Sequence, residues 1–258
     1  MPYVQLPAVN TYYEQAGSGP AVVLLHGGLF GAESWFAQRD ALAAEFEVYL
    51  PERRGHAHTP DVPGPLTYQA MADDTVAFLE AVVPGPAHLV GWSDGAVVGA
   101  LAAAQRPDLV NRLVLIGQYF NPSGQAPDGL VELMSSRWRE APPAFLHEHY
   151  DRVSPDGPGH YPVFLGKMLD MVTREPDIPL SGLAAITAQT LVLQGDKDEV
   201  LIGHSAEVAA AIPGGRLAVL PGTHALPMES PDLVNQLLIS FLRDGPPHAA
   251  WDFRGAPD

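Results

Sequence analysis

The sequence predicts an α/β fold in which helices cover both faces of a mostly parallel β-sheet. Short apolar runs alternate along the chain with segments whose apolar residues recur at helical spacing. Apolar runs without polar alternation are typical of strands that are buried on both faces, as in a parallel sheet. The alternation extends over most of the 258 residues, and no internal repeat interrupts it. We therefore expect one doubly wound domain.

Each element is predicted from its own residues. The apolar runs predict strands at residues 21–26, 47–52, 87–92, 112–117, 190–195 and 216–221. Helical patterns lie between or after them, at residues 67–83, 94–105, 205–212 and 231–242. Thr67 is the expected N-cap of the first helix, and Pro107 marks the end of the second. Two short runs, residues 3–6 and 11–15, are expected to form an antiparallel hairpin at the edge of the sheet.

The alternation breaks between residues 120 and 186. This stretch is rich in aromatic residues, proline and histidine, and it has helical patterns without strands. We expect residues 120–186 to be a small helical lid, inserted into a core made of residues 1–119 and 187–243. In open α/β sheets the carboxyl edge that such a lid covers is where ligands bind. Residues 244–258, DGPPHAAWDFRGAPD, are predicted to be a loose C-terminal tail.

The composition excludes several classes of function. A net charge of −16 argues against a surface for nucleic acid or an anionic membrane, because both need clustered Lys and Arg. The absence of cysteine rules out disulfides, zinc held by cysteine and a cysteine nucleophile. The N-terminal residues lack the pattern of a signal peptide, and no apolar segment has the ~20 residues that a membrane helix needs. We expect a cytoplasmic monomer or homodimer that acts on a small molecule.

The stretch GWSDGA, residues 91–96, places one serine in a sharp turn between a predicted strand and a predicted helix. Such a turn lifts the hydroxyl of Ser93 out of the sheet and directs helix N–H groups at a substrate. Only small residues fit beside it, which accounts for Gly91 and Gly95. The alternative is an ordinary tight turn, because the motif alone is short enough to arise by chance.

A nucleophilic serine needs a base and an acid that orients the base. The penultimate strand runs into GDKD, with Asp196 and Asp198, and the last strand runs into GTHA, with His224. Carboxyl ends of parallel strands meet at one edge of the sheet, so both turns are expected beside Ser93. The order Ser, Asp, His along the chain is the order that α/β sheets with this turn use.

Four motifs together resemble the α/β-hydrolase superfamily, over about residues 12–242. Besides GWSDGA and the acid and histidine turns, LLHGG resembles its oxyanion loop, and ERRGHAHT resembles its D-x-R-G-x-G-x-S loop. The second loop departs from the family pattern at Glu52, Ala57 and Thr59. GWSDG also occurs in the biphenyl-hydrolase-like branch, whose members include hydrolases of amino-acid esters. The resemblance thus implies an α/β-hydrolase fold with a small helical lid.

The resemblance also implies roles for named residues. Ser93 would be the nucleophile, His224 the general base, and Asp198 the orienting acid, since the family pattern is G-x-x-D. Asp196 remains the alternative acid. The backbone N–H groups of Gly28 and Asp94 would form the oxyanion hole, with Leu29 as an alternative to Gly28. Neither a metal nor an organic cofactor is required by this chemistry.

The expected activity is hydrolysis of small carboxylic esters through an acyl-enzyme. Alternatives on the same residues are hydrolysis of lactones or of C–C bonds, and perhydrolysis. The alternative from another class is a ligand receptor without catalytic activity, because a fold does not fix a function. The carboxylate of Asp94 has two interpretations, recognition of a substrate ammonium group or stabilisation of the first helical turn.

The remaining candidates concern substrate binding and metals. The residues expected to line an apolar pocket are Leu29, Trp92, Trp138, Phe164 and Met168. His26 precedes the oxyanion glycines and is expected to organise that loop by hydrogen bonds. His147 and His149 are two residues apart and would lie on different faces of a helix, so we expect no metal site there.

Overall fold

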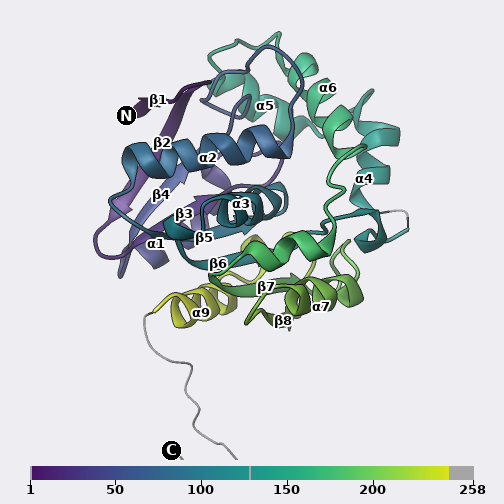
Figure 1. The fold of residues 1–258 in the computed structure, drawn as a ribbon. Coiled ribbons are helices and arrows are strands. Elements are labelled where there is room, and N and C mark those ends of the chain that lie inside the picture. The colour runs from purple at the N-terminus through teal and green to yellow at the C-terminus, as the bar shows by residue number, and fades with distance from the viewer. Residues whose placement is uncertain (1, 128, 244–258) are drawn as a thin grey trace, which may run out of the picture.

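The computed structural model describes residues 2–127 and 129–243, and within them the strands form one sheet (Figure 1). Its order is β1-β2-β4-β3-β5-β6-β7-β8, with antiparallel pairing between β1, β2 and β4 and parallel pairing elsewhere. The strands are β1 (Tyr3–Gln5), β2 (Asn10–Gly17), β3 (Ala21–Leu25), β4 (Glu47–Pro51), β5 (Ala87–Trp92), β6 (Val110–Ile116), β7 (Gln189–Gly195) and β8 (Arg216–Leu220). The predicted mostly parallel sheet with an antiparallel edge is confirmed.

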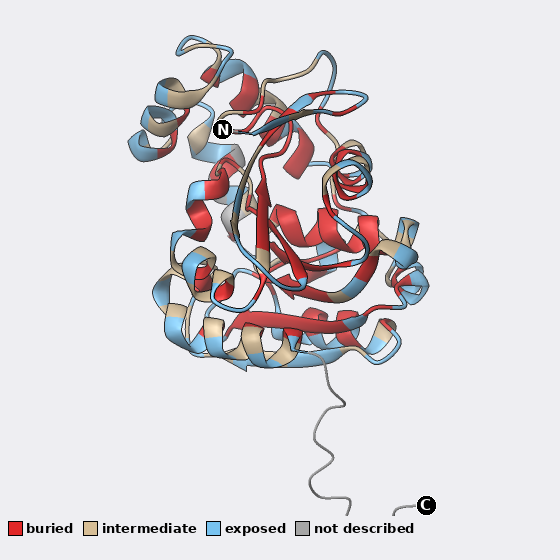
Figure 2. Ribbon diagram, turned by 90° about the vertical axis from the view of Figure 1, so that its left-hand side faces the viewer, coloured by how far each residue is buried: buried red, intermediate tan, exposed pale blue. Residues whose placement is uncertain are grey.

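Successive strand residues pack on opposite faces of the sheet, and both faces are buried. In β3, Val22 and Leu24 belong to the core under α1 (Phe36–Ala43) and α9 (Pro231–Leu242). Val23 and Leu25 belong to the core on the opposite face, which is covered by α2 (Tyr68–Val82), α3 (Asp94–Gln105) and α7 (Ile202–Ala211). Figure 2 shows the central strands in the buried colour between helices whose outer faces are exposed. Burial on both faces explains why the strands read as unbroken apolar runs.

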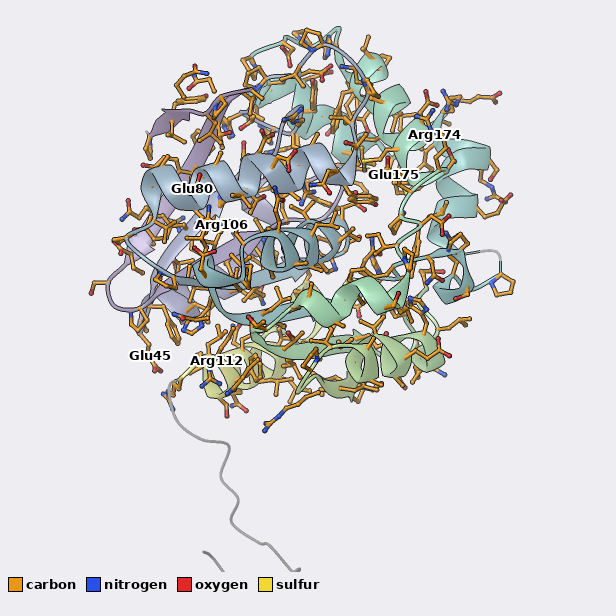
Figure 3. The ribbon with its side chains drawn as sticks, in the orientation of Figure 1. Glu45, Glu80, Arg106, Arg112, Arg174 and Glu175 are labelled. Atoms are coloured by element: carbon orange, nitrogen blue, oxygen red, sulfur yellow. The ribbon has the colours of Figure 1, made fainter. Side chains whose placement is uncertain are left out.

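Local signals set the helix boundaries that were predicted. The Oγ1 atom of Thr67 accepts a hydrogen bond from the N–H of Ala70 at 3.1 Å, and α2 begins at the next residue. Helix α3 ends just before Arg106 and Pro107, and an ion pair joins Arg106 to Glu80 of α2 (Figure 3). Helix α1 was not predicted. Its sequence, FAQRDALA, buries only Gln38 and Leu42 and so carries little helical pattern.

Residues 120–186, here called the helical segment, contain helices and no strand among the described positions. The helices are η3 (Pro122–Gly124), α4 (Leu130–Leu133), the π-helical η4 (Met134–Trp138), α5 (Ala144–Val153), α6 (Tyr161–Val172) and η5 (Leu180–Ala185). Short elements η1 (Ala32–Trp35), η2 (Pro107–Leu109) and α8 (Leu226–Glu229) belong to the rest of the chain. No helix within the described residues is long and apolar enough to span a bilayer. The predicted tail at 244–258 lies outside the described residues.

Polar contacts hold the helical segment against the rest of the molecule. Asp61, in the loop after β4, accepts hydrogen bonds from Lys167 at 2.7 and 2.8 Å and contacts His160 at 2.9 Å. Both partners belong to the segment around α6. Near the start of α2, the N–H of Tyr68 donates to the carboxylate of Glu175 at 3.0 Å, where Figure 3 places Glu175 beside that helix. These ties fix the segment over the carboxyl edge of the sheet.

Candidate active site

Ser93 occupies the turn between β5 and α3 in a strained backbone conformation. Its φ and ψ angles are 54° and −126°, in a region that non-glycine residues rarely adopt. The flanking glycines make the turn sterically feasible. A Cβ atom on Gly91 would lie 2.2 Å from the carbonyl oxygen of Gly95, and one on Gly95 would lie 2.1 Å from that of Leu25. The two glycines therefore allow the strained backbone conformation of Ser93.

A chain of hydrogen bonds runs from Ser93 through His224 to Asp198. The Nε2 atom of His224 lies 3.0 Å from Ser93 Oγ, and its Nδ1 atom lies 2.9 Å from Asp198 Oδ1. A carboxylate can only accept, so Nδ1 carries the proton and Nε2 is free to accept from the serine hydroxyl. The Asp198 side chain is 1% exposed, and its Oδ1 also accepts from the N–H of Val200 at 3.2 Å. Asp196, the other candidate acid, instead accepts from the N–H of Gly222 at 3.0 Å.

The loop that carries His224 is held by neighbours that the sequence did not single out for this purpose. The indole Nε1 of Trp92 donates to the carbonyl oxygen of His224 at 2.8 Å. Glu229 accepts from the N–H and hydroxyl of Thr223 at 2.8 and 2.7 Å. Gly117 leaves room for the side chains of Asp198 and His224, since a Cβ atom there would lie 2.8 Å from Asp198 Oδ2. The histidine is thus positioned through its backbone as well as its ring.

The glycine loop after β3 faces Ser93 from across the cavity. Gly27, Gly28 and Leu29 all line the cavity, and Leu29 has a φ angle of 65°. A Cβ atom on Gly28 would lie 2.3 Å from Asp94 Oδ2, so only glycine fits beside that carboxylate. Asp94 opens α3, where the first N–H groups have no acceptor within the helix. Backbone donors from two segments therefore border the space above Ser93.

The carboxylate of Asp94 is buried in the floor of the cavity and has a defined partner. Its Oδ1 accepts from the hydroxyl of Tyr68 at 2.7 Å. Burial, and then the charge of Asp94, raises the pKa of Tyr68 well above its ordinary value, so the phenol remains a donor. Burial also raises the pKa of Tyr119, another cavity residue, with Asp94 as the second cause. The Asp94 carboxylate thus faces the cavity with one oxygen held by a protonated phenol.

A buried cation lies behind the glycine loop. The guanidinium of Arg53 donates to the carbonyl oxygens of His26 and Gly27, the latter at 3.1 Å. Burial lowers the pKa of Arg53 to about 10, against the raising effect of Asp94, so the group is charged at neutral pH. Burial, and then Arg53, holds the pKa of His26 well below its ordinary value. Neutral His26 accepts from the N–H of Arg53 at 3.1 Å, which fits the organising role expected from the sequence.

The three departures in the ERRGHAHT loop keep the loop folded. Glu52 accepts from the N–H groups of Ala32 and His58 at 3.1 and 2.6 Å. Ala57 has a φ angle of 43°, the left-handed conformation that favours glycine at this family position. Thr59 donates from its hydroxyl to the carbonyl oxygen of Glu52 at 2.9 Å. Glu52 and Thr59 thus hold the loop by hydrogen bonds, and Ala57 adopts a strained backbone conformation within it.

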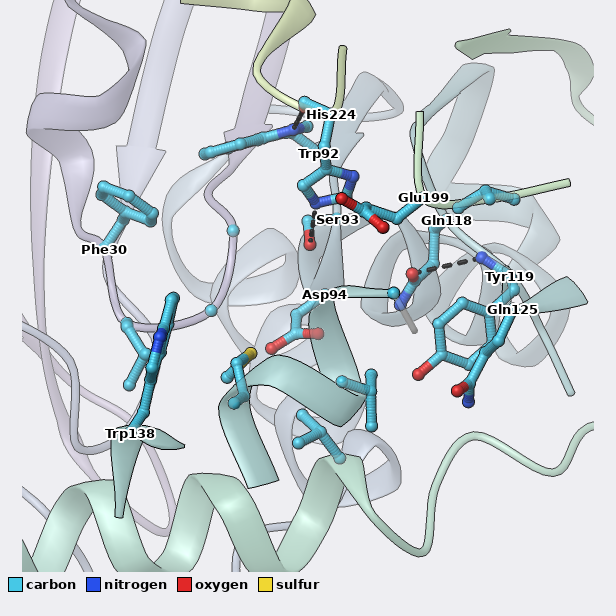
Figure 4. A pocket seen from close by; sticks show the side chains of 18 of the residues that line it. Phe30, Trp92, Ser93, Asp94, Gln118, Tyr119, Gln125, Trp138, Glu199 and His224 are labelled. Atoms are coloured by element: carbon cyan, nitrogen blue, oxygen red, sulfur yellow. Dashed lines mark hydrogen bonds between the residues drawn. The ribbon is translucent and has the colours of Figure 1, made fainter. Parts of the chain in front are cut away.

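The cavity next to Ser93 has an apolar side and a polar side. Its volume is about 110 Å³. Apolar lining residues include Leu29, Phe30, Trp92, Val131, Met134, Trp138, Phe145, Leu146, Val172 and Val200. Polar lining residues are Asp94, Gln118, Tyr119, Gln125, Glu199 and the Ser93–His224 pair. Figure 4 shows Phe30 and Trp138 on one side and Gln118, Tyr119 and Gln125 on the other.

Three of the five substrate-binding residues expected from the sequence line the cavity, and two do not. Leu29, Trp92 and Trp138 line the cavity, whereas Phe164 and Met168 do not. Both belong to the buried face of α6, where Phe164 stacks on Tyr150 at 5.2 Å between ring centroids. Met168 packs under the glycine loop, with its Cε atom 3.0 Å from where a Gly28 Cβ would be. They support the cavity wall from behind, whereas Val172 at the end of the same helix lines the cavity.

Several lining residues were missed by reasoning from the sequence. Gln118 and Tyr119 follow Gly117 just after the end of β6, so the rule that ligands bind at the carboxyl ends of strands could have indicated them. Gln125 reaches the cavity through a single bridge between its backbone and that of Val200. No pattern in the sequence predicts that bridge.

His147 and His149 of the helical segment contact different acidic side chains. His147 pairs with Asp151 at 2.9 Å, and His149 lies 3.4 Å from Glu33. Their rings have different partners, as expected for positions two residues apart on a helix. Within the described residues, no three His, Asp or Glu side chains are grouped so that they could hold a metal ion.

Comparison with known proteins agrees with this architecture. The family model of the alpha/beta hydrolase family matches residues 22–237. A protein named "Putative carbamate hydrolase RutD" from Agrobacterium fabrum is 28% identical over 85% of this chain and 92% of its own length. The serine hydrolase BPHL of Homo sapiens is 25% identical over 93% of this chain and 85% of its own.

A solved structure is similar over nearly the whole chain. The thermophilic esterase from Thermogutta terrifontis is 26% identical, with a TM-score of 0.69 over 94% of this chain and 98% of its own. The family match covers the strands and turns that carry Ser93, Asp198 and His224. The chain therefore belongs to the alpha/beta hydrolase family and is a hydrolase of that family.

Proposed function

We propose that the protein is a serine hydrolase that cleaves small carboxylic esters through an acyl-enzyme. The observation that carries the proposal is the hydrogen-bonded chain of Ser93, His224 and Asp198, which opens into a cavity lined by apolar residues. Nucleophile, base and orienting acid lie within hydrogen-bond reach, as acyl transfer by serine requires. The resemblance to a solved esterase supports the same chemistry.

Each step of the reaction has a group positioned for it. Ser93 Oγ attacks the ester carbonyl carbon while His224 Nε2 takes its proton, and Asp198 stabilises the resulting imidazolium. The N–H groups of Asp94 and Gly28 hold the oxyanion, and one such donor stabilises the transition state by about 3 kcal/mol. His224 then protonates the leaving alcohol, and water, deprotonated by the same imidazole, hydrolyses the acyl-enzyme.

The size and charge of the cavity indicate the acyl group. Its volume is about 110 Å³, somewhat less than the roughly 150 Å³ of an apolar cavity that holds benzene. We therefore propose a short acyl group. Arg53 lies behind the loop and offsets the charge of Asp94, which favours a neutral acyl group over a cationic one. In this proposal the helical segment is the lid that excludes water from the acyl-enzyme.

A carbamate or an α-amino ester is the second candidate, and Asp94 is the observation that favours it. A carboxylate that faces the cavity can accept hydrogen bonds from N–H groups on a small acyl part. The names of the RutD and BPHL relatives, a carbamate hydrolase and a serine hydrolase, are compatible with such substrates. Tyr68 already occupies one oxygen of this carboxylate, which leaves the other for a substrate.

The first test is hydrolysis of p-nitrophenyl esters from acetate to decanoate by wild type and Ser93→Ala. Loss of the nucleophile should reduce kcat by about a thousandfold or more. Activity in the wild type should be greatest for the shortest acyl chains, because of the cavity volume. Equal rates in the two proteins, or no turnover of any ester, would move the assignment to a ligand receptor or a narrow C–C bond hydrolase.

The second test separates the two substrate candidates. p-Nitrophenyl acetate, a p-nitrophenyl carbamate and a p-nitrophenyl glycine ester share one leaving group and differ only in the acyl part. The ester proposal expects acetate to be cleaved at least as well as the other two. A preference for the N–H-bearing acyl groups that is lost in Asp94→Asn, with acetate cleavage retained, would select the second candidate.

A further inference from the structure

A second pocket opens beside the catalytic cavity, and the proposed chemistry does not yet use it. Its volume is about 250 Å³, against about 110 Å³ for the cavity. The two spaces share Leu29, Phe30, Phe145 and Leu146 in their linings, so they adjoin each other along these side chains. This space is here called the outer pocket.

Three separate parts of the chain form the walls of the outer pocket. The segment between β3 and the start of α1 contributes Phe30 and Phe36, and helix α5 contributes Phe145. The third wall is Met228 of α8, four residues after His224. The pocket therefore borders the glycine loop on one side and helix α8, which follows the turn of His224, on another.

This position matches the path of a leaving group. In acyl transfer the histidine gives its proton to the leaving oxygen, so the alcohol part must extend from the side of His224. The outer pocket reaches that side through Met228. The polar side of the cavity, with Gln118 and Tyr119, lies away from Phe30 (Figure 4), and it is left for the acyl part.

The chemistry of the walls indicates what they bind. Phe36 is 66% exposed and Phe145 is 62% exposed, two rings of unusual exposure at the mouth of one pocket. Covering an exposed phenyl ring with an apolar group lowers the free energy, and contact between two aromatic rings lowers it further. Glu33 and His149, 3.4 Å apart, close the polar end of the pocket. The pocket thus offers aromatic contacts on the side of the leaving group.

We propose that the outer pocket is the subsite for the alcohol part of the substrate, and that it prefers an aromatic alcohol. The inference rests on the proposed ester hydrolysis and names the half of the substrate that the small cavity does not hold. A short acyl group and a large aromatic alcohol together fill the two adjoining spaces.

The test compares benzyl acetate with ethyl acetate, which share the acyl group and leave as simple alkoxides. The wild type should cleave benzyl acetate with a kcat/KM about tenfold higher, since an added apolar group in a hydrophobic pocket changes kcat/KM by about tenfold or more. In the variant Phe36→Ala/Phe145→Ala this ratio should fall towards one. Phe145 also lines the cavity beside Ser93, so ethyl acetate should lose some activity, but benzyl acetate should lose more. Both rings are largely exposed, so the variant should keep the melting temperature of the wild type.

Val163→Ala is the matched control, because Val163 is 50% exposed on α6 and lies outside both pocket linings. It should keep the wild-type preference. Equal kcat/KM values for the two acetates in the wild type would overturn the subsite, as would an equal loss for both esters in the double variant. If neither ester shows turnover that depends on Ser93, the proposed function itself fails, which separates the two conclusions.

Discussion

The two sides of the cavity beside Ser93 are built by different means. On the sheet side, Ser93, Asp198 and His224 each stand in the turn that follows a strand, after β5, β7 and β8. Register within a parallel sheet fixes where those turns meet, so topology alone brings the three side chains together. On the other side, Trp138, Phe145 and others come from the helical segment, whose position depends on packing and a few polar ties. The proposed catalytic residues are thus positioned by the sheet, and the proposed contacts with a substrate are positioned by the helical segment.

The strongest test of this contrast is Asp198→Asn on the sheet side. The change keeps the size of the side chain but permits the wrong tautomer of His224, so kcat should fall by about 10⁴. The melting temperature should change little by comparison, because the sheet does not depend on this carboxylate. Steady-state hydrolysis of p-nitrophenyl acetate measures the effect.

Asp196→Asn is the matched control for that experiment, because Asp196 lies two residues earlier in the same turn. It accepts from the N–H of Gly222 and is exposed, so its replacement should leave most of the activity. If Asp196→Asn were the more damaging change, the assignment of the orienting acid to Asp198 would be wrong.

The sheet side could be predicted from the sequence more completely than the helical segment. The turns at Ser93, Asp198 and His224 could be located because glycine spacing and strand order are local signals, and the structure brings those residues within hydrogen-bond distance. The strands were predicted to within about two residues, since burial on both faces leaves unbroken apolar runs. Helix α1 was missed because it buries only Gln38 and Leu42, so its sequence holds little of the helical pattern.

The helical segment could not be resolved in this way. Trp138, Phe164 and Met168 are equally apolar in the sequence, yet only Trp138 lines the cavity. Which face of a helix meets the cavity depends on contacts with distant residues, such as the stacking of Phe164 on Tyr150. The buried Arg53 was missed for a related reason, because its partners, the carbonyl oxygens of His26 and Gly27, carry no signal in side-chain types.

Asp61 connects the rest of the molecule to the helical segment through its contacts with Lys167 and His160. Asp61→Asn removes the charge that accepts from Lys167 and contacts His160, and it leaves the ammonium group of Lys167 partly buried without its counter-ion. The free energy of unfolding should fall by about 2 kcal/mol. Denaturant unfolding at neutral pH measures it. Asp170→Asn is the control, since its ion pair with Arg139 is exposed and should contribute little.

The loss of stability in Asp61→Asn should depend on pH. Burial would raise the pKa of Asp61, but hydrogen bonds from Lys167 and His160 outweigh it and lower the pKa below its ordinary value of 3.8. A lowered pKa in the folded state means that the stabilisation is complete above 3.8 and is lost as the pH falls through the folded value. The difference between wild type and Asp61→Asn should therefore be constant above about pH 5 and shrink in stronger acid. A difference that persists unchanged at low pH would mean that the charge of Asp61 is not its source.

The smallest expected effect compares two tryptophans that line the same cavity from its two sides. Trp92, on the sheet side, donates to the carbonyl oxygen of His224, whereas Trp138 belongs to the helical segment. Trp92→Phe removes a hydrogen bond whose net value is about 1 kcal/mol and lets the histidine turn shift, so kcat should fall by about tenfold. Trp138→Phe should instead raise KM and leave kcat nearly unchanged, because it alters only a contact with bound substrate. If both variants changed KM alone, Trp92 would be a binding residue like Trp138, and the position of the base would not depend on the indole. A fall in kcat confined to Trp92→Phe would instead show that the sheet also positions the proposed base, through the residue next to the proposed nucleophile.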